Sequence, residues 1–482
     1  MSRISLKYLR PSTNSEILAV QFLVSSFAFL LLGGALGLGL RAEVSLSAVN
    51  LMGADAYSRL FTNHGSITIF LWLMPAIAGL THALLPRALG VDRMALPRLG
   101  AFAFWLLPLG GLLILVSFFF EGASSGWTAY APLSVQRSGF GQTLWAVSLI
   151  SVVLSLGLSS TNFLATVLSG RRKVIWEMPQ FGWATLASSA LALISAPILL
   201  VGLVTLVLNR LIAGSTFLAS SLGLTLWQNA FWFFAHPATY IMLLPTMGVV
   251  SEIVQKYSGK PLVAHRSVAM ATLAIAGLGL LSWGQHMFAS GLIPSVRVPF
   301  MIASMAVAIP MGFILFAWLA TLWTGRVQFD TPMLFALGFI SMFLLAGLSG
   351  MVLASIPADL QLHDSYFVLG HSHFALIGGV MSGLFAGIYY VFPMITGRGY
   401  DERLGKLHFL AHFGGVHMAF LPMFILGLLG TPRRVFDFDP DVQLFQLAST
   451  GGALMLAGAA FLFLYNLYFA WRSGKSTVRE LA

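Results

Sequence analysis

The chain contains no cysteine, and only 9% of its 482 residues are charged, against roughly 25% in an average soluble domain. Without cysteine there can be no disulfide, no C-x-x-C-H haem attachment and no thiolate-bound copper centre within this chain. The shortage of charge, together with a hydrophobic content of 58%, excludes an ordinary water-soluble domain. Any thiolate-bound metal that serves this chain must therefore belong to a partner.

Long apolar runs are what the sequence has in abundance, and about 20 residues suffice to cross a bilayer. The runs are at residues 16–40, 62–85, 99–120, 140–169, 178–208, 222–252, 267–290, 299–324, 331–355, 365–394, 406–430 and 445–471. The first run is too long for a cleaved signal peptide and lacks a small-residue cleavage pattern, so we expect a true span. The loops are short. We expect an all-α integral membrane protein, with residues 1–482 forming one twelve-helix domain.

The net charge of +10 is distributed between the spans rather than gathered on one soluble face. If the N-terminus is inside, nineteen of the 26 Lys and Arg residues fall on the inner side, as the positive-inside rule requires. This asymmetry predicts a multi-pass protein with both termini cytoplasmic. We expect a prokaryotic cytoplasmic membrane as its location, lipid as its surroundings and no nucleic acid as a partner.

Carboxylates and lysines avoid the span centres, but five histidines do not. A lone histidine on an apolar face is usually a packing residue, yet these five all fall in the predicted outer half of the membrane. Neutral imidazole is a common ligand of haem iron and copper, so the group predicts buried metal. The five are His64, His236, His286, His371 and His373. The remaining six sit nearer span ends and are His82, His265, His363, His408, His412 and His417.

Two spacings refine the prediction. At 100° per residue, His371 and His373 point about 200° apart, so they cannot chelate one ion and must face opposite sides of their helix. Two metals, one on either side, would satisfy both. His236 and Tyr240 are four residues apart and share a helix face, which places a phenol beside an imidazole. Taken alone, this second pair fits aromatic packing equally well.

Six segments, in order along the chain, resemble motifs of subunit I of the haem–copper oxidases. Residues 232–240 (WFFAHPATY) resemble W-F-F-x-H-P-x-x-Y, and residues 363–373 (HDSYFVLGHSH) resemble H-D-T-Y-Y-V-x-x-H-x-H. The other four segments are 57–65, 126–134, 283–288 and 432–434. The resemblance covers nearly the whole chain and implies a twelve-helix bundle that holds two haems and a non-haem metal.

By this resemblance, His64 and His373 would be the axial ligands of a low-spin haem, and His371 the proximal ligand of a high-spin haem. That assignment agrees with the opposite directions expected for His371 and His373. His236 and His286 would bind the non-haem metal that faces the high-spin iron. The resemblance thus gives each of the five histidines a ligand role.

Further site residues follow from the same resemblance. Tyr240 occupies the position where the oxidases carry a tyrosine joined covalently to a metal-ligand histidine. Trp127 belongs to an outer-loop segment near the haem propionates, and Arg433 and Arg434 would pair with those propionates through planar guanidinium groups. Arg41 resembles an arginine near the ring substituent of the low-spin haem; a snorkelling arginine at the interface is the alternative.

One more pair lies outside the haem ligands. His363 and Asp364 resemble an outer non-redox metal site. The alternative is a single solvated acid–base pair. Neither reading is fixed by the sequence.

The chain departs from the family pattern in its ligands and its proton-carrying groups. Gln285 stands where the family has a third metal-ligand histidine, and an amide oxygen is a harder, weaker ligand for copper than imidazole, which favours iron at this site. The usual glutamate is Ala238, the tyrosine–serine pair that can replace it is Phe234 and Ala235, and the usual lysine is Ile314. These changes argue against proton pumping by the family's two routes. With no carboxylate or lysine at mid-membrane, we expect the inner half of the bundle to be empty of polar groups and protons to be taken up from the outside through the polar outer loops.

These features predict a membrane respiratory reductase that passes electrons from the low-spin haem to the high-spin haem and non-haem metal. The ligand and channel losses favour reduction of two NO to N2O, whereas Tyr240 argues for O2, which is the alternative. A haem-free transporter and a haem-binding subunit without gas turnover are two further alternatives. Electrons would arrive from other respiratory subunits, carrying a cytochrome c or a copper site.

Overall fold

The computed structural model describes residues 7–473 except 48, 137–138, 171–174 and 213. Within these residues, twelve helices are long and apolar enough to cross a membrane. The predicted all-α class and the predicted number of spans are therefore confirmed. The boundaries differ most in the second span, which begins at Ala54 rather than at residue 62. His64 consequently lies well inside that span and not at its start.

Several spans consist of more than one helical segment. In chain order the spans are α2 (Ser15–Glu43), α3 (Ala54–Ser66) with η2 (Ile67–Leu73) and α4 (Met74–Leu89), α5 (Pro97–Ser117) with η3 (Phe118–Phe120), α7 (Gly141–Gly170), α8 (Gln180–Leu211), α9 (Ser221–Ser258), α10 (His265–Leu280) with η6 (Trp283–Met287), α11 (Pro294–Ala306) with α12 (Ala308–Trp323), α13 (Thr331–Ala354), α15 (Tyr366–His373) with η7 (Phe374–Met381) and α16 (Ser382–Thr396), α17 (Glu402–Leu428), and η8 (Pro440–Val442) with α18 (Gln443–Ser473). Short helices in the connections are η1 (Lys7–Leu9), α6 (Leu133–Gln136), η4 (Ile175–Glu177), η5 (Phe217–Ala219) and α14 (Ile356–Leu362).

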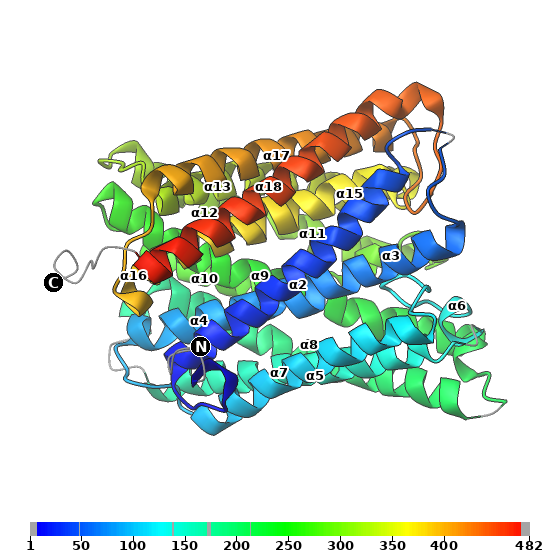
Figure 1. Ribbon diagram of the computed structural model, residues 1–482, viewed down its shortest axis with the longest axis horizontal. Helices are drawn as coiled ribbons and strands as arrows, with labels where there is room; N and C mark the ends of the chain where they lie inside the picture. Colours follow the sequence, from blue (N-terminus) through cyan, green and yellow to red (C-terminus); the bar gives the residue numbers. More distant parts are fainter. Residues whose placement is uncertain (1–6, 48, 137–138, 171–174, 213, 474–482) are drawn as a thin grey trace.

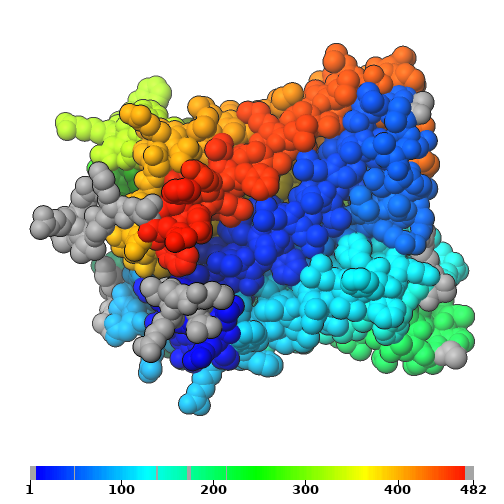
Figure 2. Space-filling view, viewed as in Figure 1, coloured from blue at the N-terminus to red at the C-terminus, as the bar shows by residue number. Residues whose placement is uncertain are grey.

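The helices run roughly along one direction, so the bundle has two ends (Figure 1). The first described residues of α2 and the last of α18 lie at the left of Figure 1, which we call the terminal end. The connections that contain α6 and that precede α15 lie at the right, which we call the loop end. In the space-filling view, α2 and α18 cross one face side by side (Figure 2).

Two spans change from α-helix to π-helix within three residues of a histidine. The π-helical segment η2 begins three residues after His64, and η7 begins directly after His373. Wide turns of this kind occur mostly as short insertions in α-helices and frequently at functional sites. The two histidines expected to share a haem thus lie at equivalent structural junctions.

Small residues allow the spans to approach closely, as is common where lipid provides no hydrophobic driving force between helices. A Cβ atom on Gly452 of α18 would lie 2.2 Å from the backbone nitrogen of Ala419 in α17. A Cβ atom on Gly248 of α9 would lie 2.8 Å from the Cα of Phe181 in α8. Glycine is required at both positions because backbone, not a flexible side chain, occupies the space.

The half of the bundle nearer the terminal end is not free of polar groups, contrary to the expectation from the sequence. His408 and His412 of α17 are 0% exposed, as is His82 of α4. Their positions along the chain are near span ends, but the neighbouring helices extend far enough to bury them. Burial of these histidines is a result of packing between spans that residue counting could not anticipate.

Candidate metal and cofactor site

A cavity of about 920 Å³ lies within the bundle, and all five histidines singled out from the sequence line it. They are contributed by four different spans. The other predicted site residues on its wall are Arg41, Trp127, Tyr240, Gln285, His363, Arg433 and Arg434. Asp364 is the one predicted site residue that is not part of the wall. The structure therefore gathers residues more than 350 positions apart into one site.

Three of the histidines are held by hydrogen bonds at Nδ1. Nδ1 of His64 lies 2.8 Å from the carbonyl oxygen of Gly33, and Nδ1 of His373 lies 2.8 Å from that of Leu369. A carbonyl only accepts, so each Nδ1 carries the proton and Nε2 keeps its lone pair. Bonds of this kind fix the tautomer and orientation of metal-binding imidazoles.

Nδ1 of His371 also carries the proton, but its hydrogen-bond partner is a hydroxyl group. Its Nδ1 lies 3.1 Å from Oγ of Ser349, and that hydroxyl already donates to the carbonyl oxygen of Leu345 at 2.8 Å. The oxygen of Ser349 therefore accepts from Nδ1 of His371, which again leaves Nε2 free. Ser349 was not identified from the sequence, because nothing in a serine within an apolar run indicates its partner.

The opposite directions predicted for His371 and His373 are observed. His371 faces α13, where a Cβ on Gly350 would lie 3.0 Å from its ring. His373 stacks on Phe420 of α17, with the ring centroids 4.6 Å apart. The two imidazoles thus contact different helices, α13 and α17.

Glycines make room for two of these rings. A Cβ on Gly37 would lie 2.9 Å from Cε1 of His64, closer than real Cβ contacts allow. Gly350 leaves space beside the ring of His371 in the same way. The space next to each ring is thus open only because the facing residue has no side chain.

His236 and His286 are arranged differently from the other three. Nδ1 of His236 lies 3.0 Å from Nε2 of His286. Two nitrogens that each bind one ion at about 2.0–2.1 Å and subtend roughly a right angle are separated by about 2.9 Å. The pair therefore has the spacing of two ligands of a single metal ion, and Gln285 beside it also lines the cavity.

The surrounding residues hold this pair in place. The indole of Trp232 stacks on the His286 ring, with centroids 4.0 Å apart and planes 9° apart. Nε1 of the same indole donates a hydrogen bond to the hydroxyl of Tyr130. Pro237 follows His236 and cannot donate to the carbonyl of Phe233, which removes one helical hydrogen bond at this point.

Tyr240 lies on the same face as His236, as predicted. The two rings meet edge to face with centroids 5.3 Å apart. A Cβ on Gly279 would lie 2.5 Å from the Tyr240 ring, so α10 can approach the phenol only with glycine at that position. The phenol thus occupies a fixed place on the cavity wall.

Arg41 is directed into the bundle and toward α18. Its guanidinium donates to the backbone carbonyl of Gln446 at 2.6 Å and to Oγ1 of Thr450 at 3.0 Å. Snorkelling to the interface, one of the two alternatives, does not describe this geometry. The side chain is positioned by hydrogen bonds beside the cavity.

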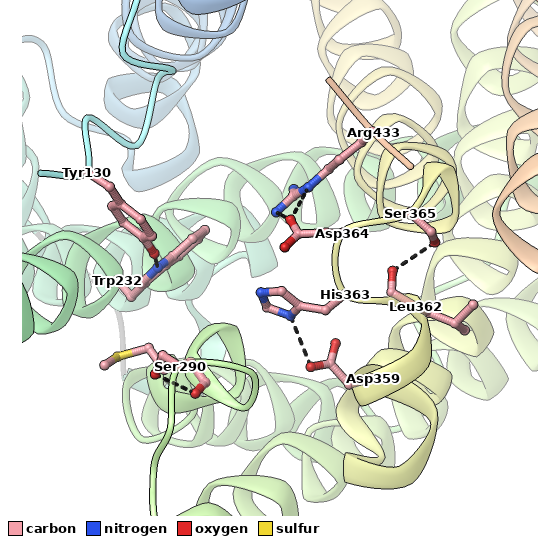
Figure 3. A network of polar contacts seen from close by, with 10 residues as sticks. Tyr130, Trp232, Ser290, Asp359, Leu362, His363, Asp364, Ser365 and Arg433 are labelled. Carbon is pink, nitrogen blue, oxygen red and sulfur yellow. Dashed lines mark hydrogen bonds and ion pairs between the residues drawn. The ribbon is translucent and has the colours of Figure 1, made fainter. Parts of the chain in front are cut away.

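At the loop end, His363 and Asp364 pair with other residues and not with each other (Figure 3). Nδ1 of His363 lies 3.0 Å from Oδ2 of Asp359. Asp364 accepts from Nε and Nη2 of Arg433 at 2.9 and 2.8 Å. The alternative of a single acid–base pair between His363 and Asp364 is therefore not what the structure shows, because Asp359 precedes His363 by one turn of α14.

Asp359 was missed in the sequence, although its spacing of four residues from His363 is a helical signal. It is 4% exposed. Among the described residues, no group of three or more His, Cys, Asp or Glu side chains could hold a metal ion. An outer metal at His363 would thus need ligands of other kinds.

The two neighbouring arginines have different surroundings. Burial alone would raise the pKa of Asp364, but the charge and hydrogen bonds of Arg433 outweigh it and lower that pKa. Desolvation, followed by the charge of Arg433, lowers the pKa of Arg434 to about 10. Arg434 has a left-handed backbone with φ of 67° and lies over the Phe61 ring at 5.2 Å. Positive charge is thus concentrated at this edge of the cavity.

Comparison with known proteins shows the family. Residues 17–455 match the family described as cytochrome c and quinol oxidase polypeptide I. The chain belongs to this family. It is 42% identical over 473 residues to cytochrome c oxidase subunit 1 of Thermostichus vulcanus, covering 97% of this chain and 86% of the relative. It is 41% identical to the Synechocystis protein of that name, covering 98% and 86%.

The fold agrees with this membership. A solved heme-copper terminal oxidase dimer superposes with a TM-score of 0.80, covering 96% of this chain and 85% of that chain, at 20% identity. The chain is thus a multi-pass catalytic subunit of the haem–copper oxidase family, which implies two haems and a copper centre. A haem-free transporter is excluded.

The comparisons also correct the preference for NO. The named relatives are cytochrome c oxidase subunits, so the oxygen alternative fits better and the NO preference is not supported. The preference rested on the loss of one ligand and of several proton-carrying groups. Those changes concern only a few positions of a chain that aligns over 473 residues with an oxidase subunit. They leave the histidine pair and Tyr240 in place.

Proposed function

We propose that this chain, acting as one catalytic domain, reduces O2 to water with electrons supplied by a partner subunit. The observation that carries the proposal is the pair His236 and His286, with facing nitrogens 3.0 Å apart, on the same cavity as His371. When bound, the haem irons and the copper would supply electron transfer and the binding of O2. Each O2 takes up four electrons and four protons to give two waters.

The ligand assignment follows from the hydrogen bonds at each ring. His64 and His373 present Nε2 toward the cavity and would hold the low-spin haem. His371, with Nδ1 bound to Ser349, would hold the high-spin haem. His236 would bind the copper through Nδ1 and His286 through Nε2. Trp232 keeps His286 oriented by stacking, so the pair is preorganised.

Other residues bind and orient the cofactors or the proton. Arg434, with its positive charge at the loop end of the cavity, would pair with haem carboxylates, and Trp127 forms part of the same wall. Arg41 would contact the edge of the low-spin haem. Tyr240 places a phenol beside His236, where it can give a proton to the bound gas.

NO is the second candidate substrate, and one observation favours it. Gln285 replaces a third imidazole in the copper site and lines the same cavity. An amide oxygen suits iron better than copper, so the metal content decides between the candidates. Copper at this position would support the O2 proposal, and iron at this position would support the NO proposal.

We also propose a membrane and an orientation for this chain. The excess of Lys and Arg between alternate spans supports both termini being cytoplasmic, in a prokaryotic cytoplasmic membrane. The partner would carry the covalently attached haem of a cytochrome c or the thiolate-bound copper site that a chain without cysteine cannot form. Accessory subunits would bury part of the lipid-facing surface.

The test is turnover of the purified complex. O2 uptake with a reduced electron donor is measured beside anaerobic NO consumption and N2O formation, with metal analysis of the same sample. We expect O2 uptake that is abolished in His286→Ala and retained in His417→Ala, a histidine that bonds within its own helix. NO turnover without O2 uptake would replace the first candidate by the second.

A further inference from the structure

The three histidines with a hydrogen-bonded Nδ1 differ in the atom that accepts the bond. His64 and His373, which we assign to the same haem, each face a backbone carbonyl oxygen at 2.8 Å. His371, which we assign to the other haem, faces the hydroxyl oxygen of Ser349 at 3.1 Å. The two rings of one haem thus have matching acceptors, and the ring of the other haem has a different acceptor at a longer distance.

The hydroxyl of Ser349 has a single proton, and the backbone of its own helix takes it. Oγ of Ser349 donates to the carbonyl oxygen of Leu345 at 2.8 Å, with that of Ala346 at 3.1 Å. Serine in a helix can bond back to the preceding turn in this way. A lone pair of Oγ therefore remains for Nδ1 of His371. The hydrogen bonds run in one direction, from the ring through the hydroxyl to the backbone of α13.

The residue after Ser349 lets the two helices approach closely enough for this contact. A Cβ on Gly350 would lie 3.0 Å from Cε1 and 3.7 Å from Nδ1 of His371. The ring of His371 is therefore held by two consecutive residues of α13, although it belongs to α15. By contrast, Nδ1 of His373 is bound by Leu369 of its own helix. Only tertiary contacts orient His371.

The acceptor at Nδ1 influences how strongly Nε2 of the same ring donates to a metal. A hydrogen bond from Nδ1 raises the basicity of the imidazole as a ligand. The two carbonyl contacts are shorter than the usual N–H···O distance of about 2.9–3.0 Å, and the contact with Ser349 is longer. The bond from His371 is therefore the weakest of the three and raises the basicity of its ring least.

We propose that Ser349 is a positioning residue that fixes the ring of His371 and keeps its Nε2 a weaker donor than those of His64 and His373. This role rests on the haem assignment made under the proposed function. A weaker donor on one side suits a haem that must bind gas on its other side. His64 and His373, as two stronger donors, would occupy both sides of their haem and leave no place for gas.

A matched pair of substitutions separates the hydroxyl from the shape of the side chain. Ser349→Thr keeps the hydroxyl, whereas Ser349→Val has the same branched shape with a methyl group in its place. Ser341→Ala is the control on the same helix. Ser341 is exposed, and its hydroxyl donates to the carbonyl oxygen of Gly338 within α13.

The measurement is the stretching frequency of the bond between the haem iron and the proximal histidine. It is recorded by resonance Raman spectroscopy on the purified complex, chemically reduced without O2, so it requires no turnover. In Ser349→Val we expect this band to move to lower frequency and to broaden, because Nδ1 loses its acceptor and the ring is free to turn. Ser349→Thr should restore the wild-type band.

Turnover provides a second readout on the same samples. O2 uptake should fall by about ten-fold in Ser349→Val, at the lower end of the range for lost hydrogen-bond partners of metal-binding histidines. Ser341→Ala should match the unchanged protein in both the band and O2 uptake. NO turnover and the CO difference spectrum of the reduced complex are recorded beside them.

The outcomes distinguish this role from the proposed function. A wild-type band in Ser349→Val, or the same shift in Ser349→Thr, would overturn the role of the hydroxyl. A shift that depends on the hydroxyl, in a complex that takes up no O2, would overturn the proposed function and keep the role of Ser349. A reduced complex with no CO-binding haem would overturn both. If Ser349→Val fails to assemble, Ser349→Ala removes the hydroxyl without added bulk and provides the test.

Discussion

Nδ1 of His236 and Nε2 of His286 face each other at 3.0 Å, although the two residues are fifty positions apart and belong to different spans. His236 lies within a long helix, and His286 lies on the tight segment η6 that follows α10. Gln285 is adjacent to the pair and faces the same cavity. The proposed metal site would therefore consist of two imidazoles and an amide, and its third position would determine which metal it prefers.

Restoring the third imidazole should change which metal occupies the site. In Gln285→His, we expect copper to replace any iron at this position and to bind more tightly, because imidazole suits copper better than an amide oxygen does. Metal analysis and O2 uptake, compared with NO turnover, are the measurements. Gln285→Ala is the control that removes the amide without adding a ligand. Unchanged metal content and turnover in Gln285→His would mean that this side chain is not a ligand.

His371 and His373 should affect different haems. His373→Ala should abolish the low-spin haem spectrum, and His371→Ala should remove the haem that binds CO, because the ring of His373 faces α17 and the ring of His371 faces α13. Absorption spectra of the reduced protein with and without CO distinguish the two losses, and His417→Ala should leave both intact. The same spectral loss in both variants would contradict separate roles.

Gly37 should be intolerant of a methyl group. In Gly37→Ala the added Cβ would lie 2.9 Å from Cε1 of His64, whose Nδ1 is held by the carbonyl of Gly33. The ring cannot move without losing that bond, so we expect an altered low-spin haem spectrum and lower haem content. Gly157→Ala is the matched control, because no described atom apart from its chain neighbours and the backbone of its own helix would lie within 4 Å of the added Cβ.

Gly157→Ala should instead be neutral or stabilise the helix by about 0.5–1 kcal/mol. Haem content by the pyridine assay and thermal unfolding measure both variants. Equal haem content in Gly37→Ala and Gly157→Ala would show that His64 can shift freely and would argue against its role as a haem ligand.

The pairing of Asp364 with Arg433 predicts a pH dependence at the loop end. The pKa of Asp364 is lowered in the folded protein, below an unfolded value of about 3.9. Its stabilising contribution is therefore complete above the unfolded pKa and is lost as the pH falls through the folded one. Thermal unfolding of the wild type and Asp364→Asn, from pH 6 to pH 3, should differ most at pH 6 and converge in acid.

Asp441→Asn is the control for that series, because Asp441 is an exposed carboxylate in η8, the short 3-10 helix that precedes α18. Its difference from the wild type should stay constant across the same range. A difference between wild type and Asp364→Asn that does not shrink toward pH 3 would refute the stabilising ion pair.

The sequence by itself determined the number of spans, the family and the opposite directions of His371 and His373. Each of these depends on local quantities: the length of an apolar run, the order of motifs, and the angle between two residues on one helix. The same local rule paired His236 with Tyr240. These features needed no knowledge of which spans are neighbours.

Only the tertiary structure decided which residues meet across spans. It paired His363 with Asp359 and Asp364 with Arg433, directed Arg41 to α18, and supplied Ser349 as the partner of His371. It also buried His408 and His412 side by side with Tyr389 and Ser382. A histidine near the end of an apolar run has the same sequence signature whether water or a neighbouring helix covers it. Contacts between helices distant in the chain depend on how the whole bundle packs, which local spacing does not specify.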